Sequence, residues 1–225
     1  MEAPFCLSDS ELELLSDYLR LKVFEVCQNA GSGHIGGSSA AVELFVALYF
    51  GGILKYSPVD PCHPDRDRVL VRGHIGPLRY PLFNLLGWLE DDELLQYRRL
   101  GSRLHGHEDY QATPGVDITP SGSLGMLLSY GVGCSLSGRD AIKDYTTFVF
   151  IGDGEEQEGN VSEAARHVAH LGLTNLIAIL DRNGKQLSDP TTIADSSNVE
   201  ALWSAYGWKH FSLKKEIMLS KYVRH

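Results

Sequence analysis

Asp153 and Asn183 are the residues whose type and position point most directly to chemistry. Asp153 lies between two glycines at the end of an apolar run, and Asn183 is followed by Gly184 shortly after a second run. Carboxylate and amide oxygens are hard ligands of the kind that Mg²⁺ shares with substrate phosphates. Each group alone also fits an ordinary turn. Together, with 28 residues between Gly154 and Asn183, they predict a site for a metal-bound diphosphate.

A β-α-β unit is expected to position these groups. Apolar runs at 146–151 and 175–180 predict two strands, and apolar residues at helical spacing over 161–171 predict a helix between them. Such a crossover joins parallel strands, so the polar groups should meet at the carboxyl ends, where open α/β sheets bind ligands. A helix beginning near Gly159 would add its positive end. The fold class predicted is α/β, with a mostly parallel sheet flanked by helices.

Composition limits the classes of protein that need consideration. The 225 residues are 43% hydrophobic, and the net charge of −9 argues against a general nucleic-acid or membrane-surface binder. No apolar run approaches the roughly 18 residues of a membrane span, and the acidic amino terminus does not resemble a signal peptide. The four cysteines are scattered, which predicts free thiols in a reducing cytoplasm.

The amino-terminal part is expected to be helical. Ser8 and Glu11 form a capping box, and an apolar stripe continues to Asn29. A glycine-rich segment over 30–38 then leads into a second helix over 39–50. This segment contains the G-x-G-x-x-G of dinucleotide-binding proteins, but that fingerprint requires a preceding strand, so we expect no Rossmann site.

The remaining elements are assigned by the same patterns. A short buried strand is expected over 69–71 and a long loop, more often functional than idle, over 101–121. Further helices are expected over 77–86, 91–100 and 123–137, and from a cap at Asn198 to Gly207.

Three of the nine histidines, His34, His74 and His107, lie beside glycines in expected loops. Glycine neighbours expose an imidazole ring and let the backbone approach a ligand, although a lone histidine is usually structural. A zinc site formed by His105, His107 and the Cys62-His63 pair is the alternative, but the ligands do not have the usual spacing.

Taken together, these segments resemble the amino-terminal, thiamine-diphosphate-binding (PP) domain of transketolases, as found in the amino-terminal subunit of split members. The resemblance runs from about residue 12 to 208, through AGSGHIGGS, PDRDRVLVRGH, LGSRLHGHEDYQATPGVD, SGSLG, GDGEEQEG and LDRNGKQLS. It implies a thiamine-diphosphate-binding fold in a domain over 1–208, incomplete at its carboxyl end. A divergent basic tail over 209–225 follows, as a truncation or frameshift would produce.

The resemblance also implies roles for particular residues. The implied metal ligands, around Mg²⁺ or alternatively Ca²⁺ or Mn²⁺, are the Asp153 and Asn183 side chains and the Lys185 carbonyl. The implied cofactor-binding residues are His74, Gly122, Ser123, Leu124, Gly154, Glu158 and Asn183. His74 and Gly154 would contact the diphosphate, residues 122–124 would lie against the rings, and Glu158 would join an acidic network at the family's dimer interface. His34 and His107 are the implied catalytic residues, facing the donor sugar and transferring protons.

The implied reaction transfers a two-carbon glycolaldehyde unit from a ketose phosphate to an aldose phosphate, as in the pentose phosphate pathway. The family's activating glutamate lies on a pyrimidine-binding domain that this chain lacks, so a pyrimidine-domain subunit is the expected partner, together with self-association. The chain alone is expected to be inactive. Two alternatives are a degenerate or truncated non-catalytic homologue and another thiamine-diphosphate enzyme, such as 1-deoxyxylulose-5-phosphate synthase.

The sequence departs from the family pattern at four positions. Ile35 and Glu108 stand where the family usually has proline after a histidine. Met126 and Leu127 stand where glutamine and glycine are common. These changes bear on loop rigidity and on packing against the cofactor rings.

Overall fold

The computed structural model describes residues 1–118, 122–186 and 189–212. The chain forms two compact units. The first contains residues 1–67 and 73–118, and the second contains 68–72 and the described residues from 122 to 212. Of the basic tail expected over 209–225, all but 209–212 lies outside the described residues.

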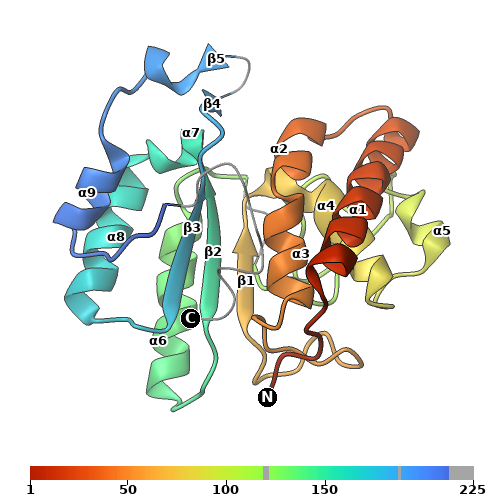
Figure 1. Ribbon diagram of the computed structural model, residues 1–225, viewed down its shortest axis with the longest axis horizontal. Coiled ribbons are helices and arrows are strands. Elements are labelled where there is room, and N and C mark those ends of the chain that lie inside the picture. The colour runs from red at the N-terminus through yellow and green to blue at the C-terminus, as the bar shows by residue number, and fades with distance from the viewer. Residues whose placement is uncertain (119–121, 187–188, 213–225) are drawn as a thin grey trace. The chain divides into compact units, whose positions relative to one another are not determined.

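The second unit is built on a parallel three-stranded sheet (Figure 1). Its strands are β1 (Arg68–Val71), β2 (Thr147–Gly152) and β3 (Leu176–Asp181), in the order β1-β2-β3. The register aligns Gly152 at the end of β2 with Asp181 at the end of β3. The predicted α/β class and the predicted parallel β-α-β unit are therefore confirmed.

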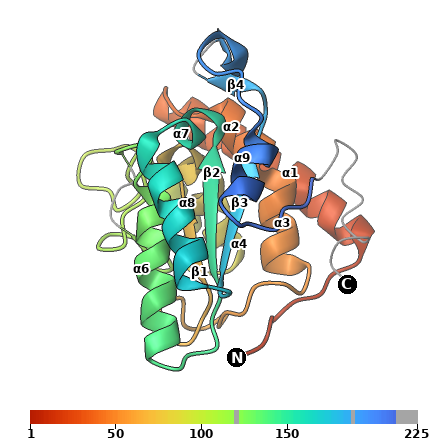
Figure 2. The same ribbon diagram turned by 90° about the vertical axis from the view of Figure 1, so that its left-hand side faces the viewer.

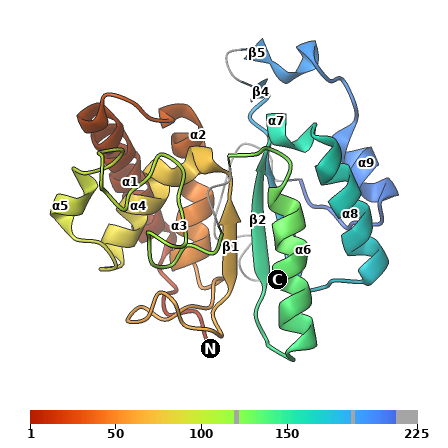
Figure 3. The ribbon, with the colours of Figure 1, turned by 180° about the vertical axis from the view of Figure 1, so that it is seen from behind.

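Two helices, α6 (Leu127–Asp140) and α8 (Gly159–Leu171), run side by side on one face of this sheet (Figures 2 and 3). α8 begins at Gly159 as expected, and its buried stripe contains Val161, Ala164, Ala165 and Val168. The unit also contains α7 (Asp153–Glu156), the β4 (Lys185–Gln186) and β5 (Asp189–Pro190) ribbon, the 3-10 helix η2 (Thr191–Ile193) and α9 (Val199–Ala205). Asn198 caps α9 as predicted, accepting the Ala201 N–H.

The first unit is helical. It contains α1 (Asp9–Ala30), α2 (Ile35–Ala40), α3 (Val42–Phe50), the 3-10 helix η1 (Gly73–Ile75), α4 (Gly76–Leu85) and α5 (Asp91–Leu94). The long α1 packs against α3 and α4. The predicted capping box of Ser8 and Glu11 is present, and Gly31 ends the helix in the left-handed conformation that favours glycine.

Three predicted helix boundaries are wrong, each for a local reason. The helix expected over 39–50 is two helices, because the chain turns at Ala41. The helix expected over 91–100 ends at Leu94, because turns with hydrogen bonds between residues three apart follow and Arg98 adopts a φ of 59°. The helix expected from residue 123 begins at Leu127, because Gly125 has a φ of 85°.

No helix in the described ranges is both long enough and apolar enough to cross a membrane.

Two glycines of α6 provide a matched test of this packing. A Cβ on buried Gly131 would lie 2.5 Å from a Val149 methyl carbon of β2, whereas a Cβ on exposed Gly133 would meet no described residue within 4 Å. We expect Gly131→Ala to lower the free energy of unfolding by about 1–3 kcal/mol through overpacking. Gly133→Ala should raise it by roughly 0.5–1 kcal/mol through helix propensity. Urea unfolding measures both, and equal effects would contradict the packing of α6 on β2.

Candidate functional site

The carboxyl ends of β2 and β3 bring Asp153 and the segment after β3 together. Asp153 directly follows β2 as the first residue of α7, and it is 8% exposed. One carboxylate oxygen, Oδ2, accepts the Gly184 N–H at 3.0 Å. The predicted meeting of the Gly-Asp-Gly group with Asn183-Gly184 is therefore observed.

The glycine before Asp153 leaves space for an arginine side chain. Arg72, directly after β1, forms a buried ion pair with Asp181 at the end of β3. Since β2 lies between these strands, the guanidinium passes over Gly152, where a Cβ would lie 2.7 Å from Nη1. Gly152 thus allows a cross-strand ion pair directly behind Asp153.

Asn183 and Lys185 form a compact turn beside Asp153. Asn183 Oδ1 accepts the Lys185 N–H at 3.0 Å, and Gly184 adopts a φ of 76°, in the left-handed region that favours glycine. Asn183 and Lys185 are exposed. The Gln157 side chain bonds to Gln186 Oε1 at 2.6 Å, which ties α7 to β4.

Glu155 anchors the segment that the resemblance places against the cofactor rings. Its side chain is buried, and its Oε1 accepts the Gly125 N–H at 3.2 Å. Burial raises the pKa of this carboxyl, and the N–H groups of Gly125, Gly152 and Leu127, together with Arg72, partly oppose that effect. The residues that precede Gly125 are exposed: Gly122, Ser123 and Leu124. Sequence reasoning missed Glu155, although its place directly after Gly-Asp-Gly was visible.

Glu158, at the amino end of α8, is also exposed. A Cβ on Gly125 would lie 2.6 Å from the Glu158 Cβ, so Glu158 packs beside the turn that Glu155 anchors. Its expected role at a dimer interface stays a prediction.

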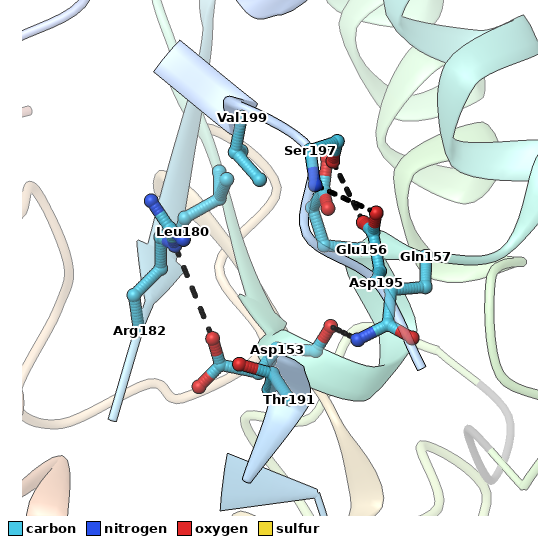
Figure 4. A pocket seen from close by; sticks show the side chains of 10 residues that line it. Asp153, Glu156, Gln157, Leu180, Arg182, Thr191, Asp195, Ser197 and Val199 are labelled. Atoms are coloured by element: carbon cyan, nitrogen blue, oxygen red, sulfur yellow. Dashed lines mark hydrogen bonds and ion pairs between the residues drawn. The ribbon is translucent and has the colours of Figure 1, made fainter. Parts of the chain in front are cut away.

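A small pocket, partly open to solvent, lies at Asp153 (Figure 4). It is lined by Gly152, Asp153, Glu156, Gln157, Leu180, Arg182, Thr191, Asp195, Ser197 and Val199. Burial is the largest cause that raises the pKa of Asp153 and of Glu156. Arg182 Nε lies 3.9 Å from Asp153 Oδ1.

The donor chemistry of this edge fits a magnesium ion that carries a diphosphate. The available donors beside Asp153 are a carboxylate, an amide oxygen and backbone carbonyls, the hard ligands that Mg²⁺ prefers. A cation would also stabilise the charged form of Asp153, which burial disfavours. Gly154 leaves room above the edge, since among the described residues a Cβ there would meet only Gln186, at 3.6 Å. Across the described residues, no group of three or more His, Cys, Asp or Glu side chains is arranged to hold a metal, so the zinc alternative gains no support.

The first unit gathers three predicted histidines into one cluster. His34 precedes α2, His74 lies in η1, and His107 lies in the loop after residue 101. Ring centroids are 4.7 Å apart for His34 and His74, 6.0 Å for His34 and His107, and 5.9 Å for His74 and His107. Gly73 makes this possible, because a Cβ there would lie 2.4 Å from the His107 ring.

The rings of His34 and His107 are held toward the neutral form. Burial lowers the pKa of both, and the positive charge of Arg98 lowers it further. Neutral imidazoles carry a lone pair at physiological pH and can accept a proton. The cluster is therefore chemically suited to proton transfer.

The two departures beside histidines have different consequences. Ile35 takes the first position of α2, where proline is also well accommodated. Glu108 is 1% exposed, and its Oε2 lies 3.6 Å from Nε of the fully buried Arg79. Burial outweighs the Arg79 charge and raises the Glu108 pKa to about 7. Sequence reasoning marked Glu108 as a departure but missed its pairing with Arg79.

Comparison with known proteins identifies the family. Residues 12–220 match the family described as "Transketolase, thiamine diphosphate binding domain". The chain is 35% identical over 199 residues to one subunit of the apulose-4-phosphate transketolase of Phocaeicola vulgatus, covering 88% of this chain and 70% of that relative. It is 36% identical over 206 residues to the 6-deoxy-6-sulfo-D-fructose transketolase subunit SqwG of a Clostridium species, covering 90% and 74%.

Solved structures agree with this result. The transketolase from Leishmania mexicana superposes with a TM-score of 0.84 at 30% identity, covering 90% of this chain and 31% of that chain. The chain thus spans about a third of a single-chain transketolase and most of each subunit relative. It belongs to the transketolase thiamine-diphosphate-binding domain family, as its motifs predicted. The match continues beyond residue 208, where the resemblance was expected to end.

Replacing Glu108 with Gln tests its altered ionisation. A carboxyl whose pKa is raised from 4.5 to about 7 by folding loses stabilisation as pH rises through that window. Gln cannot ionise, so the free energy of unfolding of Glu108→Gln should rise relative to wild type between pH 4.5 and about 7 and level off above it. At about 1.4 kcal/mol per pKa unit, this rise in the free energy of unfolding of the variant relative to wild type is on the order of 3 kcal/mol at most.

Urea unfolding at a series of pH values measures this difference. Glu13→Gln, on an exposed site of α1, is the control and should show no such rise. A Glu108→Gln difference that stays constant across the window would contradict the altered ionisation of Glu108.

Proposed function

We propose that this chain binds thiamine diphosphate with Mg²⁺ at the carboxyl edge of β2 and β3. We further propose that it acts in two-carbon transfer between sugar phosphates. The observation that carries the proposal is the hydrogen bond from the Gly184 N–H to buried Asp153, which joins the two halves of the Gly-Asp-Gly to Asn group. Membership of the family supplies the cofactor class.

In the proposed site, the Asp153 and Asn183 side chains and the Lys185 carbonyl hold the metal ion, for which Ca²⁺ or Mn²⁺ could substitute. The side-chain oxygen of Asn183 accepts the Lys185 N–H within its own turn. This oxygen retains a second lone pair that can bind a cation. Gly154 and His74 contact the diphosphate. Gly122, Ser123 and Leu124 lie against the rings of the cofactor, and their exposure leaves them available for that contact.

Once bound, thiamine diphosphate supplies the carbon nucleophile and the electron sink for breaking a carbon–carbon bond. The chain's own residues supply orientation and proton transfer. We assign His34 and His107 to the hydroxyl and carbonyl groups of the donor sugar, where neutral imidazoles accept and return protons. Their lowered pKa values and their place in one cluster support this role.

A partner subunit completes the proposed enzyme. Two relatives are named as transketolase subunits, and the chain spans only about a third of the single-chain transketolases. The partner supplies the pyrimidine-binding domain and the carboxylate that activates the cofactor. Exposed Glu158 is available for the acidic network expected between self-associated copies. The substrates are a ketose phosphate donor and an aldose phosphate acceptor, and the scattered, free cysteines are consistent with a cytoplasmic enzyme.

Titration calorimetry of the chain tests cofactor binding. Thiamine diphosphate should bind only when Mg²⁺ is present, because a metal ion held at Asp153 would offset the repulsion between this carboxylate and the anionic diphosphate. Asp153→Asn keeps the oxygen that accepts the Gly184 N–H but removes the charge, so it should weaken Mg²⁺-dependent binding about tenfold or more, about 1.4 kcal/mol. Asp140→Asn, at an exposed site on α6, is the control and should bind as wild type does.

Mixing with a pyrimidine-domain subunit then tests the reaction. Turnover of ketose phosphate should appear only when both subunits, Mg²⁺ and thiamine diphosphate are present. Cofactor binding without turnover would favour the non-catalytic alternative. Turnover of pyruvate in place of a ketose phosphate would favour a 1-deoxyxylulose-5-phosphate synthase activity. The absence of cofactor binding even with the partner would overturn the proposal.

A further inference from the structure

Arg98 has an unusual backbone for an arginine. Its φ of 59° lies in the left-handed region, which disfavours residues other than glycine, asparagine and aspartate. The Arg98 N–H donates to the Leu104 carbonyl at 2.9 Å, so the conformation closes the turn over residues 98–104. Gly101 in the same turn also has a positive φ, of 81°. A strained residue that persists in a fold often serves a function at that place.

The side chain of Arg98 enters the histidine cluster. Its Nη2 lies 3.5 Å from Nδ1 of His34, at the limit of hydrogen-bond distance. It passes close to the backbone of Gly106, in the His105–His107 segment. A Cβ on Gly106 would lie 2.9 Å from Arg98 Nε. Gly106 therefore makes room for the guanidinium, as Gly73 makes room for the ring of His107.

No carboxylate balances the charge of Arg98 in the described part of the chain. Its Nε is buried without a hydrogen-bond partner there. The titratable groups that face it are Cys27 of α1, its neighbour Tyr97, and the His34 and His107 rings. A half-buried guanidinium without a carboxylate partner repels a second positive charge, so it opposes protonation of the nearest imidazoles.

We propose that Arg98 is a positioning residue of the histidine cluster, which orients His34 and keeps His34 and His107 in the proton-accepting form. Its geometry supports this function independently of any ligand: a strained backbone, a side-chain path cleared by Gly106, and a guanidinium at the His34 ring. The consequence for catalysis rests on the proposed function, but the state of the two rings does not.

Histidine titrations by NMR test the proposal on the chain alone. His34→Asn and His107→Asn identify the two signals. Arg98→Asn removes the charge and retains a residue that tolerates a left-handed backbone, so both titration midpoints should shift upward. Arg98→Lys keeps a positive charge and should leave them near the wild-type values. The matched control is Arg99→Asn, since the adjacent Arg99 is exposed and donates instead to the Asn29 carbonyl.

Unchanged midpoints in Arg98→Asn, or equal shifts in Arg99→Asn, would overturn the proposal. If circular dichroism shows that Arg98→Asn does not fold, Arg98→Gly serves the same test, because glycine accepts this backbone without strain.

The dependence of the histidine titrations on ionic strength tests the proposal in the wild-type chain. Salt screens charge, so raising ionic strength should raise the midpoints of His34 and His107 if a local cation suppresses them. A fall in both would also overturn the proposal.

The functional consequence is measured separately in the reconstituted enzyme. The acid limb of the pH profile of kcat should shift to higher pH in Arg98→Asn and remain in place in Arg99→Asn. A merely structural role of Arg98 would lower kcat without moving that limb. Loss of all activity in the wild type would contradict the proposed function and would leave the NMR result to decide the role of Arg98.

Discussion

The ion pair between Arg72 and Asp181 is the constraint on which the candidate cofactor edge depends. It links the ends of β1 and β3 across β2, and it requires a residue without a side chain where it crosses. Gly152 meets that requirement, so the ion pair can cross β2 at the residue that precedes Asp153. Breaking such a pair is costly, because one charge would remain buried without its partner. The first glycine of Gly-Asp-Gly therefore serves the sheet, whereas Gly154 leaves room for a ligand.

Buried and half-buried ionisable groups also organise the surroundings of both candidate sites. Glu155 holds the turn at Gly125, so the exposed residues 122–124 are anchored to the sheet edge. In the first unit, Arg98 faces the histidine rings, and Glu108 pairs with Arg79 behind the loop that carries His107. Such groups destabilise a fold unless they are paired or hydrogen-bonded. Their presence next to residues suited to chemistry is typical of functional sites.

The parts of the structure that follow local periodicity could be predicted from the sequence. The β-α-β unit over 147–181, the capped α1 and the meeting of Asp153 with the Asn183 turn all follow from apolar spacing and the parallel crossover rule. Helix ends at Leu94 and before Leu127 could not be predicted, because they depend on left-handed residues whose conformation is set by tertiary contacts. The short α7 and the β4–β5 ribbon were missed because two to four residues carry no periodic signal. The Arg79–Glu108 and Arg98–His34 pairs join residues 29 and 64 positions apart, which no local pattern reports.

In the proposed site, the carboxyl edge of β2 and β3 binds the metal of a thiamine diphosphate complex. A crystal structure of the chain with Mn²⁺ and thiamine diphosphate, with the partner subunit if it is needed for crystals, tests this most directly, because Mn²⁺ is located by its anomalous signal. We expect one Mn²⁺ at coordination distance, about 2 Å, from oxygens of Asp153, Asn183 and the Lys185 carbonyl, with the diphosphate completing its shell. An anomalous peak elsewhere, or a bound cofactor whose metal does not touch Asp153, would contradict it.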